Sequence, residues 1–286
     1  MSDFPHEPIR SGVRRMNRTG LAIALAVAAV TGLVFGFYPD LDVAVARAFF
    51  TPKLGFTLES QTLAQFLRDA SMWIVALIAA PAVLSLVGKF VFPEKRMLVS
   101  ARATLLLVAT LIAGPLLAVN VGLKDYWSRP RPRDVIQFGA AGEFKAWWDP
   151  RGTCTNNCSF VAGEAAGAAW TLAPAALAPP HWRAFAYAGA LAFTAAVGAL
   201  RMAFGGHFFS DVVFAGVVVF LIIWLMHGLI CRWRTGVSDM AIEGALARAG
   251  RWLRRPFSGS AAPPQQSQNA AGPNSESYSS LQKGPP

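Results

Sequence analysis

Residues 103–134 read ATLLLVATLIAGPLLAVNVGLKDYWSRPRPRD, and this stretch sets the fold class. Its first part, residues 103–123, contains no charged side chain. A helix needs about 20 apolar residues to cross a hydrocarbon layer roughly 30 Å thick, so this part predicts a membrane helix. Four cations follow directly, Lys124, Arg129, Arg131 and Arg133. The stretch therefore predicts a spanning helix that ends at a strongly positive surface.

The chain as a whole has the composition of a membrane protein. Of its 286 residues 54% are hydrophobic and only 15% are charged, whereas soluble domains carry about 25% charged residues. Five further apolar runs accompany the first, at 20–38, 70–88, 162–179, 184–200 and 212–230. The run 162–179 is the weakest, because it contains Glu164 and Pro174. We predict an all-α integral membrane protein, a six-transmembrane-helix bundle spanning residues 20–230, with run 20–38 as an uncleaved anchor.

Basic residues indicate the orientation of this bundle. With the N-terminus inside, the inner segments 1–19, 89–102, 180–183 and 231–286 hold 16 of the 26 lysines and arginines. This distribution follows the positive-inside rule and places both termini in the cytoplasm. The net charge of +10 is then a topology signal with an anionic-lipid component, and no nucleic-acid partner is expected. Segment 124–158 departs from the rule, because it carries six cations on the expected outer side.

Two more polar clusters fall on that same outer face. One is VAGE at 161–164 and the other is RMAFGGHFFSD at 201–211. Ionisable groups near a bilayer are costly and usually mark a functional site. Arginine forks and lysine ammonium groups suit phosphate oxygens. A carboxylate four residues after His207 can fix the tautomer of its imidazole. The three clusters predict one phosphate site at the outer membrane face.

The spacing of these residues resembles the type 2 phosphatidic acid phosphatase superfamily over roughly residues 70–230. Its first motif is similar to residues 124–132, where six residues separate Lys124 from Arg131-Pro132. Its third motif is similar to residues 201–211, where five residues separate Arg201 from His207 and three separate His207 from Asp211. The resemblance implies that His207 is the nucleophile that forms a phosphohistidine and that Asp211 orients it. Residues that would bind the phosphate are Lys124, Arg131, Arg201 and the backbone of Ala162 and Gly163. It implies no metal and no cofactor.

The second motif departs from the family pattern. Val-Ala-Gly-Glu at 161–164 stands where the family usually has Pro-Ser-Gly-His, so Glu164 takes the place of the general acid. Glutamate has a reference pKa of about 4.3 against about 6.5 for histidine, so it acts as an acid only in a special environment. An alternative is that Glu164 simply complements a helix dipole. Arg129 and Arg133 are interpreted as lipid headgroup contacts.

The remaining segments suggest accessory features. Cys154 and Cys158 lie in the outer loop just before the second motif. Their spacing is compatible with a disulfide in an oxidising compartment, and the sequence leaves both the paired and the unpaired state open. Residues 231–255 form a basic amphipathic segment expected at the inner membrane surface. Residues 256–286 are rich in Ser, Pro, Gln and Gly and are expected to be disordered.

These observations predict a membrane lipid phosphatase of the bacterial inner membrane with a periplasmic active site. Candidate substrates are lipid A or a related glycolipid, polyprenyl diphosphates, phosphatidic acid and phosphatidylglycerol phosphate. A long basic loop favours the bulky glycolipid slightly. Two alternatives stay open at this point: a phosphotransferase that uses the same histidine, and a non-catalytic lipid-phosphate binder. Partners are the substrate and the bilayer, and no obligate protein partner is inferred.

Overall fold

The computed structural model describes residues 12–232 and 238–254. Within these ranges the chain is helical and forms no β-strand, only isolated bridges. Five helices are long and apolar enough to cross a membrane. They are α1 (Gly12–Phe37), α3 (Thr62–Val91), α4 (Ala101–Leu111) with its continuation, α8 (Pro180–Ala203) and α9 (Phe209–His227). The predicted all-α membrane architecture is confirmed, with five of the six expected spans.

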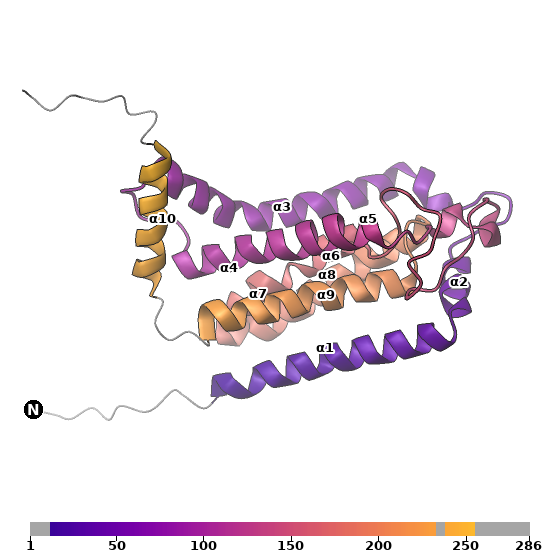
Figure 1. Ribbon diagram of the computed structural model, residues 1–286, viewed down its shortest axis with the longest axis horizontal. Helices are drawn as coiled ribbons and strands as arrows, with labels where there is room; N and C mark the ends of the chain where they lie inside the picture. The colour runs from indigo at the N-terminus through magenta and orange to yellow at the C-terminus, as the bar shows by residue number, and fades with distance from the viewer. Residues whose placement is uncertain (1–11, 233–237, 255–286) are drawn as a thin grey trace, which may run out of the picture.

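These helices lie side by side and divide the molecule into two ends (Figure 1). At one end lie the start of α1 and the C-terminal helix α10 (Asp239–Arg254). At the other end lie α2 (Asp40–Arg47) and the irregular segment 127–162. That segment contains the short 3₁₀ helices η3 (Pro132–Asp134) and η4 (Ile136–Phe138), and η1 (Thr57–Ser60) precedes α3. We call this second end the loop end.

The predicted span 162–179 is not one helix. It forms α6 (Gly163–Ala169) and α7 (Leu172–Leu177), two short helices that both pack against α8. Their alanines and glycines leave little side-chain bulk, which lets neighbouring helices approach closely. Trp170, fully buried between them, donates its indole N–H to the carbonyl of Leu107. The predicted sixth span therefore takes the form of a broken helix pair in the protein interior, and it is not among the helices long enough to cross a membrane in the described residues.

A π-helical segment, η2 (Ile112–Leu123), joins α4 to α5 (Lys124–Tyr126). Pro115 lies inside it and lacks the N–H that an α-helix requires, which explains the wider turns. Within the segment, the side-chain amide of Asn120 donates to the carbonyl of Pro115 at 2.8 Å. The segment delivers Lys124 to the loop end directly above the start of α6, where the Lys124 ammonium approaches Gly163.

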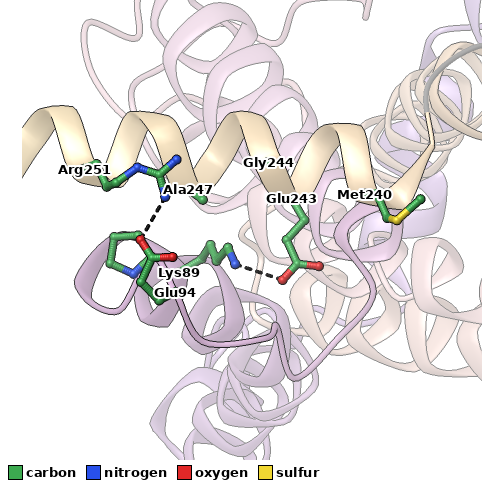
Figure 2. A pocket seen from close by; sticks show the side chains of 8 residues that line it. Lys89, Glu94, Met240, Glu243, Gly244, Ala247 and Arg251 are labelled. Atoms are coloured by element: carbon green, nitrogen blue, oxygen red, sulfur yellow. Dashed lines mark hydrogen bonds and ion pairs between the residues drawn. The ribbon is translucent and has the colours of Figure 1, made fainter.

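At the opposite end, α10 lies across the ends of α3 and α4. Lys89 of α3 is buried and donates to Glu243 of α10 at 2.9 Å, while Arg251 pairs with Glu94 (Figure 2). The Lys89 ammonium lowers the pKa of the Glu243 carboxyl. A hollow beside these pairs is lined by Lys89, Pro93, Glu94, Met240, Glu243, Gly244, Ala247 and Arg251. The expected tail 256–286 lies outside the described residues, as do residues 1–11 of the N-terminal segment.

Candidate active site

The turn between α8 and α9 presents His207 at the loop end. Helix α8 ends at Ala203, and Gly205 then adopts φ +62°, a left-handed conformation that glycine tolerates best. Gly206 follows, and a Cβ there would come within 2.7 Å of Nη2 of Arg201. Helix α9 begins at Phe209. The two glycines thus bring His207 close beneath the last turn of α8, where Arg201 lies.

The hydrogen bonds of His207 define which nitrogen is reactive. Nδ1 lies 2.7 Å from the carbonyl oxygen of Ser159, which only accepts hydrogen bonds. In a neutral ring Nδ1 therefore carries the proton, and Nε2 keeps its lone pair. Asp211 was expected to contact His207 directly, but Ser159 lies between them. The carbonyl of Ser159 contacts His207, and the hydroxyl of Ser159 donates to Oδ2 of Asp211 at 2.5 Å.

Burial keeps this imidazole neutral. His207 is 1% exposed. Burial lowers its pKa well below the usual value, and the positive charges of Arg201, Lys124 and Arg131 lower the pKa further. A neutral imidazole is the nucleophilic form, so the surroundings favour the state that can attack phosphorus. The three predicted phosphate-binding cations thus all lie close enough to His207 to act on its charge.

Those three cations come from three different elements. We call Lys124, Arg131 and Arg201 the clamp. Lys124 is the first residue of α5, Arg131 follows in the loop, and Arg201 lies in the last turn of α8. Gly163 opens α6 beside them: a Cβ there would come within 3.2 Å of the Lys124 ammonium nitrogen. The structure thus brings together the residues that the sequence predicted as phosphate ligands.

Asn157 supplies acceptors to two members of the clamp. Its side-chain oxygen accepts from Lys124 at 2.8 Å, and its carbonyl accepts from Nη2 of Arg131 at 2.6 Å. Asn157 lies within a loop that a disulfide between Cys154 and Cys158 closes. Lys124 and Arg131 form no ion pair with any carboxylate in residues 12–232 and 238–254. Two cations of the clamp are therefore held by neutral oxygens.

The third cation, Arg201, contacts a carboxylate. Its Nε pairs with Oε2 of Glu164, while Oε1 of Glu164 accepts from Arg68 of α3 at 2.8 and 2.6 Å. Glu164 was expected as the general acid. Each oxygen of this carboxylate thus contacts a guanidinium group, and its role as an acid stays a prediction. Arg68 is a contact that the sequence analysis does not identify, because nothing in its local sequence points to a site.

Beneath His207 lies a second cluster, which we call the buried network. Arg129 is fully buried and pairs with Asp42 of α2 at 2.8 Å and with Asp211 of α9. Its guanidinium also lies 4.4 Å from the ring centre of Phe208. The interpretation of Arg129 as a lipid headgroup contact is wrong, because no part of the side chain reaches the surface. Arg133 differs, since it is partly exposed and pairs with Glu59.

Backbone donors at the start of α6 also differ from expectation. The N–H of Ala162 donates to the carbonyl of Asp211 at 3.3 Å. It is thus engaged with α9 and is not directed at the clamp. Gly163 forms the first residue of α6 and stays beside Lys124. Of the two predicted backbone donors, the geometry favours Gly163.

Comparison with known proteins agrees with this geometry. A family model described as the PAP2 superfamily matches residues 102–234, which include all three motifs. A lipid A 4'-phosphatase from Francisella tularensis subsp. novicida (strain U112) is 31% identical over 219 residues, 76% of this chain and 98% of that relative. The chain belongs to the PAP2 superfamily. The resemblance seen in the motifs is confirmed.

Two further members are lipid A 4'-phosphatases from rhizobia. The protein from Rhizobium leguminosarum is 42% identical over 106 residues, 37% of this chain and 46% of the relative. The protein from Rhizobium etli is 40% identical over 105 residues, 37% of this chain and 41% of the relative. No solved structure gives a significant match. The prediction of a membrane lipid phosphatase, a hydrolase of the PAP2 superfamily, is confirmed.

Proposed function

We propose that this PAP2 protein removes a phosphate from lipid A or a closely related glycolipid through a phosphohistidine at His207. The observation that carries the proposal is the state of His207: a buried, neutral imidazole whose Nδ1 is held by Ser159 and whose Nε2 is free of hydrogen bonds to the described residues. The clamp surrounds it with three cations. A nucleophile so placed serves phosphoryl transfer better than simple binding.

The reaction has two displacements at phosphorus. In the first, the Nε2 lone pair forms a P–N bond as the bond from phosphorus to the glycolipid oxygen breaks, and that oxygen leaves with the electron pair and takes a proton. In the second, water attacks phosphorus, the P–N bond breaks, and inorganic phosphate leaves. The clamp stabilises the charge on the phosphoryl oxygens in both steps. Asp211 acts through Ser159 as a positioning residue.

Glu164 can carry the proton of the first step only after it has received one. A phosphate ester has a second pKa near 6, so a substrate monoanion brings a proton into the site. Transfer of that proton to Glu164 converts the carboxylate into an acid beside the departing oxygen. In the second step the regenerated carboxylate can accept a proton from water. Glu164 thus shuttles a proton that the substrate supplies.

Charge distribution supports a periplasmic site in the bacterial inner membrane. The end with α10 carries many lysines and arginines, among them Lys89, Lys95 and Arg96, which suits the cytoplasmic side. The loop end carries the disulfide Cys154–Cys158, which suits an oxidising compartment. Protease accessibility in right-side-out spheroplasts tests this orientation. Cleavage within the loop 139–157 supports it, and cleavage only after membrane rupture contradicts it.

The names of the relatives guide the choice of substrate. We expect phosphate release from lipid A to exceed release from phosphatidic acid and undecaprenyl diphosphate. The assay uses the full chain in detergent, with His207→Ala as the inactive variant and His227→Ala as a control for a histidine at the other end of α9. An acid-labile phosphorylated intermediate should accumulate in rapidly quenched reactions. Equal release by wild type and His207→Ala sinks the proposal, and loss of lipid phosphate without free phosphate identifies a transferase.

A further inference from the structure

Arg68 lies outside all three motifs and contacts Glu164, the carboxylate that pairs with Arg201 of the clamp. It lies in the second turn of α3, and its Nε and Nη2 both donate to Oε1 of Glu164, at 2.8 and 2.6 Å. Its other neighbour, the exposed Asp69, is more distant at 3.7 Å. A guanidinium that gives two hydrogen bonds to one oxygen holds that oxygen firmly. Glu164 is therefore tied to α3 as well as to the clamp.

The second oxygen of Glu164, Oε2, forms an ion pair with Nε of Arg201. The side chains of Arg201 and Glu164 are 9% and 17% exposed, so solvent screens their ion pair only weakly. Carboxylate and phosphate oxygens are the same kind of acceptor for a guanidinium. The contact is an ion pair and not a hydrogen bond, because neither Nε of Arg201 nor Oε2 of Glu164 has a hydrogen-bond partner among the described residues. A phosphate at this edge of Arg201 would have to take the place of the carboxylate. The free protein thus contains an anion of its own at the phosphate site.

We propose that Glu164 is an internal competitor for Arg201, that an entering phosphate displaces it, and that Arg68 is the positioning residue that retains it. Until it takes up a proton, a displaced carboxylate beside a phosphate anion suffers repulsion unless a cation remains on it. Arg68 provides that cation and, because it belongs to α3, does so without leaving its helix. The inference rests on the proposed function only in that the clamp binds a phosphate group.

The roles of the two residues oppose each other in a way that binding can measure. Without Glu164 the clamp loses its competitor, so phosphate binds more tightly. Without Arg68 the carboxylate keeps Arg201 as its single partner, so phosphate binds more weakly. Arg68 has this effect only while Glu164 is present. A residue that merely supported the fold, or one that contacted phosphate itself, would act in both backgrounds.

A double-mutant cycle with inorganic phosphate tests the proposal. Calorimetry on the full chain in detergent measures the Kd for wild type, Arg68→Gln, Glu164→Gln and the double variant. We expect Glu164→Gln to lower the Kd about tenfold and Arg68→Gln to raise it about tenfold, the range of a partly buried charge contact. The double variant should match Glu164→Gln within about twofold. Arg133→Gln is the matched control, because Arg133 lies at the same end and pairs with Glu59 instead.

Two results overturn the inference. One is an equal weakening by Arg68→Gln with and without Glu164, which makes Arg68 a direct phosphate ligand or a general charge. The other is an unchanged Kd in Glu164→Gln, which removes the competition. Where Glu164→Gln fails to fold, Glu164→Asp replaces it. The shorter side chain cannot bridge both arginines, so it should also lower the Kd.

The binding cycle and the hydrolysis assay fail separately. If the four Kd values behave as expected but lipid A is not hydrolysed, only the proposed function is contradicted. If lipid A is hydrolysed but the effects of the two substitutions on the Kd simply add, only the roles given to Arg68 and Glu164 are contradicted. As a kinetic check, Arg68→Gln should raise KM for lipid A more than it lowers kcat, and Arg68→Lys should recover part of the loss, because it restores the charge without the fork.

Discussion

The buried network and the clamp lie on two sides of His207 and handle charge in opposite ways. In the buried network one cation, Arg129, meets two carboxylates, those of Asp42 and Asp211, and every partner is shielded from water. In the clamp three cations face one another, and only Arg201 contacts a carboxylate among the described residues. Every charge of the buried network is thus paired with an opposite charge of the protein. The clamp carries more positive charge than its one carboxylate partner can balance.

This difference separates positioning from binding. A saturated buried ion network is costly to disturb, because removing one partner leaves an unpaired charge in a low-dielectric interior. A group of like charges repels itself, and a bound anion relieves this repulsion. Such a group therefore favours the binding of an anionic ligand. We therefore expect changes in the network to act on folding and changes in the clamp to act on phosphate.

Replacement of His207 should have the largest effect and leave both clusters in place. His207→Ala removes the atom that we propose forms the P–N bond, so phosphate release from lipid A should fall at least ~10⁴-fold. Binding of inorganic phosphate should change less than about fivefold, because the clamp is intact. Release assays and calorimetry on the same preparation measure the two quantities. Loss of both together would show that His207 also holds the clamp.

A break in the buried network should act mainly on stability. Arg129→Met leaves the carboxylates of Asp42 and Asp211 buried without their cation, which should cost about 3–5 kcal/mol of folding free energy. Thermal unfolding in detergent, followed by intrinsic tryptophan fluorescence, measures the shift. The triple variant Arg129→Met, Asp42→Asn, Asp211→Asn removes the charges together and should recover part of the loss. A midpoint unchanged in Arg129→Met contradicts the distinction between the two clusters.

A change in the clamp should act on phosphate alone. Arg131→Gln relieves repulsion among Lys124, Arg131 and Arg201, so the unfolding midpoint should stay equal or rise slightly. Loss of one charged donor to the phosphoryl group should lower kcat/KM for lipid A about 10²-fold. Steady-state kinetics and the unfolding assay test the pair of expectations. A variant that is both inactive and strongly destabilised argues that Arg131 is structural.

Opening the disulfide should have a smaller effect on the clamp side. Cys154→Ser with Cys158→Ser frees the loop that carries Asn157, whose oxygens hold Lys124 and Arg131. The loop is short, so the chain-entropy model gives a stabilisation of about 2 kcal/mol. KM for lipid A should change about two- to fivefold while kcat stays near wild type. Cys231→Ser, which removes a thiol outside any disulfide, is the control.

Acid should weaken the fold through His207 itself. Its pKa is well below the usual value in the folded protein, whereas the unfolded chain takes up a proton near pH 6.5. Below that pH the unfolded state binds more protons, so stability is lost as pH falls, by up to about 1.4 kcal/mol per pH unit. The unfolding midpoints of wild type and His207→Gln at pH 7.5 and 5.5 test this. Wild type should lose more than the variant.

The sequence was sufficient for the parts of the site that depend on spacing along the chain. Lys124, Arg131, Arg201 and His207 follow membrane helices at intervals that place them at one end, and the structure brings them together. It was insufficient where a partner lies far away in the chain. Arg129 meets Asp42 across 87 residues and Arg68 meets Glu164 across 96. No local pattern records such pairs, so the sequence indicates a headgroup contact for Arg129 and gives no role to Arg68.

The same limit explains the missed break in span 162–179. Hydropathy measures whether a segment tolerates lipid, and small alanines score as apolar. It does not measure whether the segment meets lipid, and α6 and α7 lie within the protein around Trp170. Glu164 and Pro174 were the signs of an atypical helix. Their positions at the starts of α6 and α7 show why both are tolerated.

The broken pair α6–α7 also bears on how the chain enters the membrane during synthesis. A translocon releases a segment into lipid according to its own hydrophobicity, and a stretch with a carboxylate and two short helices is a poor candidate by itself. Its favourable surroundings, α4, α8 and α9, include two helices that are made later. We expect residues 163–177 to wait at the translocon and to leave it only with α8. Membrane insertion of residues 163–177 would then depend on the synthesis of α8, which follows them in the chain.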